Sequence, residues 1–485
     1  MAGRLSGIRE QRIEKIKQLK ELGVDPYIGK TERTDIIAEA REKEGEKVKV
    51  VGRVMAIRGH GGLIFMDLRD ESGQMQLVIK KDNVSEREWM IQELVDIGDF
   101  VQAGGGVFKT KAGEISVEVK VFGLLSKAVR PLPSSWHGFK DVEERYRQRY
   151  VDLILNPEVR KVFDARTRIV RFLRQFMDKK GFMEVETPVL QPIYGGATAR
   201  PFKTFHNALK SEFYLRIADE LYLKRLIVGG YEKVYEIAKD FRNEGIDRQH
   251  NPEFTMMEFY WAYANYEDLM KLSEEMLGGA VKEVTGKYKI EYQGKKIDFS
   301  PGWERITFRD LVFRDTKIDI DEVKDEKGLR EMIKSRGLKV ELEEVEGYAN
   351  VLDELYKEYC RPKMTGPVFL IDHPYEMKPL AKRKSGDPSK VASVALVVAG
   401  FEIFNAYNEL NDPQDQRERW EEEKKLLEAG FKEAQMLDED YIRALEYGMP
   451  PTAGWGMGID RFTAIVTNQP NLKDTIIFPT LRPER

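Results

Sequence analysis

Two distant stretches of sequence decide the fold prediction for this chain: residues 241–245 (FRNEG), followed by 250–254 (HNPEF), and residues 454–461 (GWGMGIDR). The first offers an arginine, a carboxylate and an aromatic ring within the length of one hairpin. The second is a glycine-rich turn from a strand into a helix, and it ends in an arginine. Guanidinium groups bind phosphates, a carboxylate accepts a hydrogen bond from an amine, and a ring stacks on a base. Together the two stretches predict an ATP site.

Each stretch alone has an ordinary explanation. A Gly-x-Gly-x-Gly turn is common at the start of helices, and Arg242 and Glu244 could form a cross-strand ion pair. A dinucleotide-binding fold would require a strand–helix–strand unit and an acidic residue about 20 positions after the glycines. The chain contains no G-x-x-x-x-G-K-[S/T] phosphate loop. Only the combination of the two stretches is specific.

The length and composition predict a soluble protein of two or three domains. The chain has 485 residues, 41 % of them hydrophobic and 33 % charged, and no apolar run approaches the ~20 residues that span a bilayer. Cys360 is the only cysteine, which excludes an intramolecular disulfide and a cysteine-based zinc site. No secretory signal is visible, so we expect a cytoplasmic protein without membrane contact. The net charge of −4 does not by itself indicate nucleic-acid binding.

The hydrophobic period divides the N-terminal part of the chain. Residues 1–45 predict a helical extension with an amphipathic helix at 6–21. Residues 46–130 contain five runs of period two, with a helical stretch at 84–95 between the third and fourth. This order predicts an OB-fold barrel, a fold that often binds single-stranded nucleic acid. An isolated antiparallel sheet would give the same pattern.

The rest of the chain predicts a linker and an α+β domain. The linker spans residues 131–157 and includes a charged helix at 141–155. In residues 158–485 a first helix ends at Gly181, and long strands near 231–242 and 253–263 predict a hairpin in an antiparallel sheet flanked by helices. Residues about 310–360 predict a helical insertion.

Three further stretches carry a family resemblance: residues 181–188 (GFMEVETP), 195–202 (GGATARPF) and 215–225 (LRIADELYLKR). With the two stretches above, they resemble class II aminoacyl-tRNA synthetases, and in particular the lysyl branch, over about residues 10–484. The resemblance implies an OB-fold anticodon-binding domain at 46–130 and a class II catalytic domain at 158–485. It also implies a homodimer, because residues 181–188 resemble the motif that forms the subunit interface in the family.

The resemblance assigns the chemistry of ATP. The carboxylate of the amino acid attacks the α-phosphate, so two anions must meet, and positioned cations stabilise the charge without a covalent enzyme nucleophile. Arg242 would clamp both anions and Arg461 would hold the γ-phosphate, which makes these two the predicted catalytic residues. The predicted ATP-binding residues are Arg242, Glu244, His250, Asn251, Phe254, Glu402, Gly458 and Arg461. Glu402 and Glu409 would bind Mg²⁺ between the phosphates.

The amino-acid pocket needs buried anions, because a lysine substrate carries a cationic side chain. Strand alternation puts Glu258 and Tyr260 on one face of a strand, and it does the same for Asn405, Tyr407 and Glu409. By resemblance, the lysine-binding residues are Gly196, Glu220, Arg242, Glu258, Tyr260, Asn405, Tyr407, Glu409 and Gly456. The alternative for Glu258 is an exposed strand carboxylate, which its apolar sequence neighbours disfavour.

Four residues of the predicted barrel match positions that bind the tRNA anticodon in related enzymes: Arg58, Phe65, Gln76 and Glu114. An exposed ring that stacks on a base contributes ~1–3 kcal/mol. Phe65 could equally belong to the core of the barrel.

Some residues depart from the pattern of the family. Lys378 stands where a serine is usual, residues 391–398 are small or apolar where a charged, aromatic segment is typical, and Phe401 replaces a common basic residue. These changes leave the motif residues intact but affect the rim of the predicted pocket.

The sequence therefore predicts a lysine–tRNA ligase that uses ATP and Mg²⁺, with lysine and its tRNA as partners. The alternatives are an aspartyl or asparaginyl relative, a lysine transferase that acts on a protein or a lipid, and a catalytically silent RNA-binding regulator. Intact Arg242, Glu402, Glu409 and Arg461 argue against the regulator.

Overall fold

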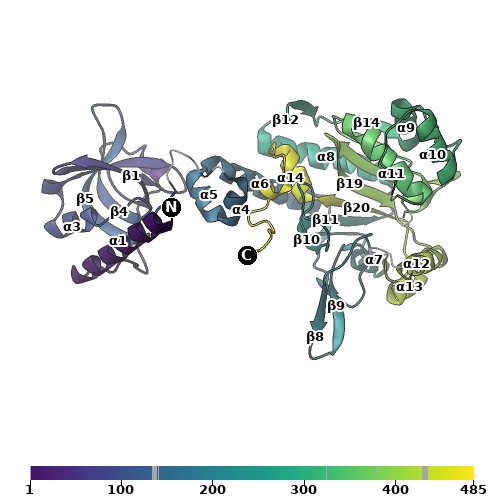
Figure 1. Cartoon of the computed structure of the whole chain (residues 1–485), viewed down its shortest axis with the longest axis horizontal. Coiled ribbons are helices and arrows are strands. Elements are labelled where there is room, and N and C mark those ends of the chain that lie inside the picture. Colours follow the sequence, from purple (N-terminus) through teal and green to yellow (C-terminus); the bar gives the residue numbers. More distant parts are fainter. Residues whose placement is uncertain are drawn as a thin grey trace. The chain divides into compact units, whose positions relative to one another are not determined.

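The computed structural model describes residues 2–133, 139, 141–323, 325–343, 345–378, 381–428 and 435–484. Positions 134–138 and 140 of the predicted linker lie outside the described residues. The chain forms two compact units, Met1–Lys140 and Asp141–Arg485, which we describe separately (Figure 1). Within the described part of the chain, no helix is both long and apolar enough to cross a membrane.

The first unit is a closed five-stranded barrel with the strand order β1-β2-β3-β5-β4. Its elements are α1 (Ala2–Glu21), α2 (Ile37–Ala40), β1 (Lys47–His60), β2 (Leu63–Arg69), β3 (Gln74–Lys80), α3 (Glu86–Glu93), β4 (Phe100–Lys109) and β5 (Ile115–Ser126). Alternate residues of the strands, such as Val50, Leu68 and Leu77, fill its core. Ser85 begins α3 with a capping box, because its hydroxyl accepts from the Glu88 backbone while the Glu88 carboxylate accepts from the backbone of Ser85. The predicted OB-fold barrel is confirmed.

The second unit is built on an eight-stranded sheet of order β14-β15-β18-β19-β20-β11-β10-β6. Its strands are β6 (Met183–Glu184), β10 (Lys233–Phe241), β11 (Glu253–Ala262), β14 (Glu304–Thr307), β15 (Val368–Ile371), β18 (Ser393–Val398), β19 (Phe401–Asn408) and β20 (Thr452–Gly458). The pairs β10–β6 and β14–β15 are parallel and all others are antiparallel. The predicted hairpin is β10 and β11, whose register pairs Glu236 with Glu258.

One face of this sheet is apolar. Trp455 of β20 lies between Phe259 of β11 and Phe404 of β19, with ring centroids 4.8 and 5.1 Å away. These rings share a core with α6 (Pro157–Lys179), α8 (Tyr266–Thr285) and α14 (Ile459–Val466). Because side chains alternate along a strand, the neighbours of these rings lie on the opposite face, where Glu258, Tyr260 and Asn405 face the candidate site.

Further helices and short strands complete the described part of the second unit. The elements not yet named are α4 (Val142–Arg147), α5 (Arg149–Leu155), β7 (Leu190–Gln191), β8 (Lys203–His206), β9 (Ser211–Leu215), α7 (Glu220–Val228), β12 (Lys289–Tyr292), β13 (Lys295–Asp298), α9 (Phe308–Thr316), α10 (Glu326–Ser335), α11 (Tyr348–Tyr359), β16 (Arg383–Lys384), β17 (Asp387–Val391), α12 (Pro413–Glu428) and α13 (Glu439–Glu446). The helical segment predicted near 310–360 corresponds to α9–α11, which gather at the β14 end of the sheet (Figure 1).

The single helix predicted at 141–155 is wrong, because α4 and α5 are separate. Gln148 breaks the helix with φ −113° and ψ 52°. The break turns Arg149 inward, where its Nε donates to the carbonyl of Ile477 at 3.0 Å. The end of α6 is as predicted, since Gly181 follows it with a φ of +79° that favours glycine.

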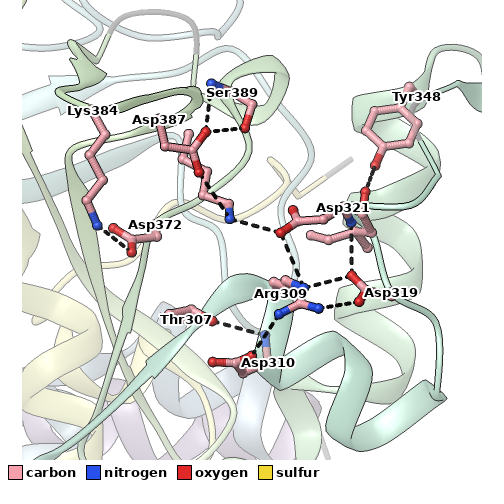
Figure 2. A network of polar contacts seen from close by, with 12 residues as sticks. Thr307, Arg309, Asp310, Asp319, Asp321, Tyr348, Asp372, Lys384, Asp387 and Ser389 are labelled. Carbon is pink, nitrogen blue, oxygen red and sulfur yellow. Dashed lines mark hydrogen bonds and ion pairs between the residues drawn. The ribbon is translucent and has the colours of Figure 1, made fainter.

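A network of ion pairs connects the hairpin β16–β17 to the region around α9 (Figure 2). Arg309 binds Asp319, with Nε 2.7 Å from Oδ1, and its Nε is also 3.2 Å from Asp321. Lys390 of β17 lies 3.0 Å from the same Asp321. Lys384 of β16 pairs with Asp372 at 2.7 Å. These pairs hold Asp372, Lys384 and Lys390, which flank the cavity-lining residues Met377, Lys378 and Ala381 in sequence.

Candidate active site

A cavity of about 200 Å³ lies at the ends of β10, β11 and β20. It collects every residue that the sequence predicts for ATP: Arg242, Glu244, His250, Asn251, Phe254, Glu402, Gly458 and Arg461. The structure reaches this arrangement because β10 and β11 form a hairpin while β20 runs beside β11 and leads into α14. We call this space the nucleotide cavity.

The two arginines of the nucleotide cavity occupy different positions. The guanidinium carbon of Arg242 lies 5.1 Å from the centre of the Phe254 ring, so cation and ring lie together. Arg461 donates to the backbone carbonyl of Glu402 at 2.6 Å. Burial lowers the pKa of Arg461, although an arginine remains charged at neutral pH. His250 contacts Asp247, with Nδ1 2.9 Å from Oδ2.

A second cavity of about 380 Å³ adjoins the first. It collects all the residues predicted for lysine: Gly196, Glu220, Arg242, Glu258, Tyr260, Asn405, Tyr407, Glu409 and Gly456. We call this space the anionic cavity. The two cavities share four lining residues, which are Arg242, Met256, Asn405 and Gly456. Arg242 is therefore the cation at their junction.

Two glycines of β20 keep the anionic cavity open. A Cβ atom added to Gly454 would lie 1.9 Å from Oε1 of Glu409 and 2.5 Å from Cε1 of Tyr260. A Cβ on Gly456 would meet Cγ of Glu258 at 3.4 Å, an ordinary contact distance. Position 454 thus requires glycine because of close approach.

The carboxylates of the anionic cavity are buried, and this changes their titration. Burial, together with the nearby Asp240 and Glu220, raises the pKa of Glu258 well above its ordinary value. The Tyr260 hydroxyl donates to Oε2 of Glu258 at 3.3 Å. A buried carboxylate of this kind is stabilised as an anion when a cation enters.

A buried arginine supports the strands beneath this cavity. Arg216 lies 2.8 Å from Glu236, 3.2 Å from Asp219 and 3.4 Å from Asp240. Its Nε also donates to the carbonyl of Lys239 at 2.9 Å. This contact joins the segment that enters α7 to β10 and fixes the position of Glu220 relative to the sheet.

Two lysines of the site are absent from the predicted site residues: Lys224 receives no role there, and Lys378 is placed only at the rim of the pocket. Lys224 lies one helical turn after Glu220 on α7, and its Nζ is 2.5 Å from that carboxylate. It also forms an ion pair with Glu409. The four-residue spacing from Glu220 was a signal that could have identified the first contact. Lys378 lines the anionic cavity and donates to Oδ1 of Asn405 at 3.1 Å.

The structure does not bring the two predicted magnesium ligands together. Glu402 lies at the start of β19 and Glu409 follows its end, a separation of roughly 20 Å along the strand. Glu402 lines the nucleotide cavity, whereas Glu409 lines the anionic cavity. Because Mg²⁺ holds its ligands at about 2.1 Å, one ion cannot be shared by both residues.

The surroundings of Glu402 are cationic. Burial alone would raise its pKa, but the neighbouring Lys378, Arg361 and Arg461 lower it. Across the described ranges, no group of three or more His, Cys, Asp or Glu side chains is arranged to hold a metal ion. Without the phosphates of a nucleotide, one carboxylate among cations offers Mg²⁺ too few oxygen ligands. The residues present therefore do not fit a magnesium ion that the protein itself would hold.

In the first unit, three of the four predicted anticodon residues share one outer face of the barrel. Arg58 of β1 pairs with Phe65 of β2, and Asp67 of β2 pairs with Gln76 of β3. Phe65 is partly buried, but its neighbours Met66 and Leu68 rather than Phe65 belong to the barrel core.

The same face also carries polar contacts. Arg58 donates to Asp67 at 2.8 Å, and Ser116 donates to Oε1 of Gln76 at 3.2 Å. Glu114 lies beside this face in the turn before β5, where Arg41 approaches it at 3.4 Å. The face thus combines one ring with hydrogen-bonding groups.

Comparisons with known proteins agree with this architecture. A family model described as tRNA synthetases class II (D, K and N) matches residues 141–482, and a model described as OB-fold nucleic acid binding domain matches residues 48–125. A lysine–tRNA ligase of Roseiflexus castenholzii is 49 % identical over 99 % of this chain and 99 % of the relative. Lysine–tRNA ligases of Pelotomaculum thermopropionicum and Moorella thermoacetica are 46 % and 48 % identical, over 99 % and 98 % of this chain and 96 % and 97 % of the relatives.

Proposed function

Because this chain belongs to the class II tRNA synthetases of the aspartate, lysine and asparagine group, we propose that it is a lysine–tRNA ligase. It activates L-lysine with ATP, releases pyrophosphate, and transfers the lysyl group to the 3′ end of its tRNA. The single observation that carries this function is the junction of a cation-lined nucleotide cavity with an anionic cavity at Arg242.

The junction supports the chemistry of adenylate formation. An oxygen of the lysine carboxylate forms a bond to the α-phosphorus of ATP, and the bond to pyrophosphate breaks. Arg242 lines both cavities, so its guanidinium can hold the carboxylate and the α-phosphate at once. Arg461 then holds the γ-phosphate. Positioning and fixed positive charge lower the barrier, without a covalent enzyme nucleophile.

The anionic cavity favours lysine over aspartate or asparagine. Glu220, Glu258 and Glu409 all line it, and the carboxylate of an aspartate side chain would be repelled there. An asparagine amide would leave the buried carboxylate of Glu258 without a counter-charge. We assign Glu258 and Tyr260 to the substrate ammonium, and Glu220 with the carbonyl of Gly196 to the α-amine.

The residues of the nucleotide cavity indicate how the adenine base and the magnesium ion of ATP are bound. We assign Glu244 to the adenine amine, Phe254 to stacking on the base, and His250 to the phosphates. Magnesium enters as the counter-ion of ATP, with the substrate, because the donor set around Glu402 does not fit a resident ion. The reaction takes place in the cytoplasm, where its tRNA partner is found.

The barrel supplies the second contact with tRNA. We propose that Phe65 stacks on an anticodon base while Arg58, Gln76 and Glu114 provide polar contacts. Stacking and hydrogen-bonding groups on an exposed face of such a barrel suit single-stranded nucleic acid.

We also propose a homodimer with two-fold symmetry through residues about 160–190. This region presents apolar side chains to solvent, since Met183 is 50 % and Leu190 48 % exposed. Isologous contacts commonly cover such patches.

An ATP–pyrophosphate exchange assay with each standard amino acid tests the function. The rate of exchange with lysine should be at least about 100-fold higher than with aspartate or asparagine. A factor of this order is expected when a buried charge lacks its partner. Transfer of labelled lysine to tRNA, but not to protein or lipid, completes the test. Exchange that depends on aspartate or asparagine would identify a different synthetase, and no exchange at all would identify a regulator.

A further inference from the structure

Lys378 occupies a position that the proposed function leaves unexplained. By the resemblance to the lysyl branch, a serine is usual at this position, and Lys378 lines the anionic cavity. It also lines a third cavity of about 440 Å³, which Arg361, Glu402 and Arg461 line as well. Glu402 and Arg461 in turn line the nucleotide cavity. The side chain of Lys378 therefore lies between the anionic cavity and this third cavity, which shares Glu402 and Arg461 with the nucleotide cavity.

The ammonium of Lys378 is directed at the junction of the substrates. It donates to Oδ1 of Asn405 at 3.1 Å, and Asn405 lines both the nucleotide and the anionic cavity. Nδ2 of Asn405 is 3.5 Å from Oε2 of Glu402, which continues the chain of polar groups. A lysine ammonium has three donor hydrogens, so it can bind Asn405 and a phosphate oxygen together.

The charge of Lys378 persists in this setting. Burial opposes the ammonium, but Tyr407, Glu402 and Asp353 raise its pKa above the ordinary value. The backbone that carries it is also fixed, because its amide donates to the carbonyl of Tyr375 and the carbonyl accepts from Ala381, both at 3.1 Å. Beyond these contacts, the pairs of Lys384 with Asp372 and of Lys390 with Asp321 anchor the segment (Figure 2).

We propose that the Lys378 ammonium is a built-in cation of the adenylate-forming centre, which binds a non-bridging oxygen of the α-phosphate and replaces a divalent ion that the protein would otherwise hold. The inference rests on the proposed function. It accounts for the poor fit of Mg²⁺ to the residues around Glu402. Arg242 and Lys378 approach the junction from β10 and from the segment before β16, so the α-phosphate lies between two fixed cations. The only divalent ion then required is the one that ATP brings.

Binding of ATP in the presence of EDTA tests this role without catalysis. Isothermal titration calorimetry on the full chain should show that Lys378→Met weakens ATP binding about 10- to 100-fold in EDTA, the range for one lost charge-assisted hydrogen bond. The loss should be smaller in excess Mg²⁺, because the ion then supplies part of the missing charge. Lys378→Arg should restore binding to within several-fold of the unmodified protein.

Lys382→Met is the matched control. Lys382 is exposed, its Nζ contacts Asn411 at 2.7 Å, and its substitution should leave ATP binding in EDTA unchanged. If the unmodified protein and Lys378→Met bind ATP equally well in EDTA, the proposal is overturned. Lys378 would then only neutralise the charge of Glu402 and would not contact the phosphate.

A second measurement needs no substitution. Mn²⁺ titrated into the unmodified protein with ATP, followed by electron paramagnetic resonance, should give one bound ion for each bound ATP. Two tightly bound ions per ATP would overturn the proposal even if Lys378→Met failed to fold. Both measurements omit the amino acid, so a protein that passes them but does not activate lysine would refute the proposed function and leave the role of Lys378 standing.

Discussion

The ammonium of Lys224 forms an ion pair with the carboxylate of Glu409, and both side chains are 2 % exposed. Burial disfavours the charged amine, but Glu220 and Glu409 hold the pKa of Lys224 well above its ordinary value. The pocket proposed for a lysine substrate thus already contains a lysine of the protein. Glu258 receives its hydrogen bond from neutral Tyr260 instead, so it is the carboxylate best placed to meet the substrate ammonium.

Substitution of Lys224 tests this internal counter-charge. Lys224→Met leaves two buried carboxylates without their cation, a change that costs about 3–5 kcal/mol for a buried pair. We expect a lower melting temperature by calorimetry and at least a tenfold rise in the KM for lysine in the exchange assay. Lys271→Met is the control, because Lys271 is 71 % exposed and its pair with Asp268, at 3.8 Å, contributes little. Unchanged lysine kinetics in Lys224→Met would show that the pair is dispensable.

Substitution of Glu258 tests the identity of the substrate. Glu258→Gln keeps the shape of the side chain and removes its charge, so the substrate ammonium loses a buried partner. We expect kcat/KM for lysine to fall by at least about 100-fold, with the KM for ATP changed little. The ratio of kcat/KM for lysine to kcat/KM for amino acids with uncharged side chains of similar length should decrease. If this variant activates lysine as well as the unmodified protein does, Glu258 does not bind the substrate ammonium.

The pH dependence of lysine binding follows from the same residue. Burial and the neighbours Asp240 and Glu220 raise the pKa of Glu258 above 4.5, Tyr260 donates to it, and Arg242 favours its ionised form. The substrate ammonium requires the ionised carboxylate, so the KM for lysine should fall as pH rises through the raised pKa.

Stability should change in the opposite direction. Between pH 4.5 and the raised pKa, the folded protein binds more protons at Glu258 than the unfolded chain does. The contribution of this residue to the free energy of unfolding therefore decreases as pH rises. The melting temperature and the KM for lysine should be measured from pH 5 to pH 8. Both should depend less on pH in Glu258→Gln than in the unmodified protein. The KM for ATP is the control. Identical profiles in both proteins would contradict the assignment.

Phe65 tests the interface with tRNA. Phe65→Ala should lower kcat/KM for aminoacylation of tRNA by ~1–3 kcal/mol, the contribution of one stacked base. Lysine-dependent pyrophosphate exchange should be nearly unchanged, because adenylate formation takes place in the other unit. A matched change in the barrel core, Leu68→Ala, should lower the melting temperature. Equal loss in both assays for Phe65→Ala would indicate general destabilisation.

Assembly can be tested at the edge strand β6. Light scattering at micromolar concentration should give the mass of a dimer, and Met183→Glu should shift it toward monomer, because a charge would be buried at the proposed interface. Tyr447→Glu provides a control, since Tyr447 is 84 % exposed and lies outside residues 160–190. A fully active monomer would refute the dimer.

Much of the architecture could be predicted because the periods are strong. Alternation of apolar residues over β2 and β3 predicts the barrel. Alternation along β11 places Glu258 on the face of the sheet opposite to that of the buried Phe259. Every residue predicted for ATP or for lysine lines one of the two cavities, although each cavity also has lining residues that were not predicted.

What could not be predicted depends on contacts between distant segments. The partnership of Lys224 with Glu409 joins residues far apart in sequence, and no local spacing indicates it. The distance between Glu402 and Glu409 follows from their positions at opposite ends of one extended strand, which a list of motif residues does not convey. The proposed role of Lys378 depends on its position between two cavities, which the sequence alone does not reveal.

Gly454 and Gly456 of β20 also decide how this enzyme could be redesigned for unnatural substrates. Position 454 offers no freedom, because even a methyl group would overlap Glu409 and Tyr260. Position 456 is different: a methyl group there would only touch Glu258 and Met256, both at 3.4 Å. A library aimed at shorter diamino acids should therefore start at 456, whereas one aimed at bulkier acylated lysines must gain its space from other lining residues, such as Tyr407 or Met377.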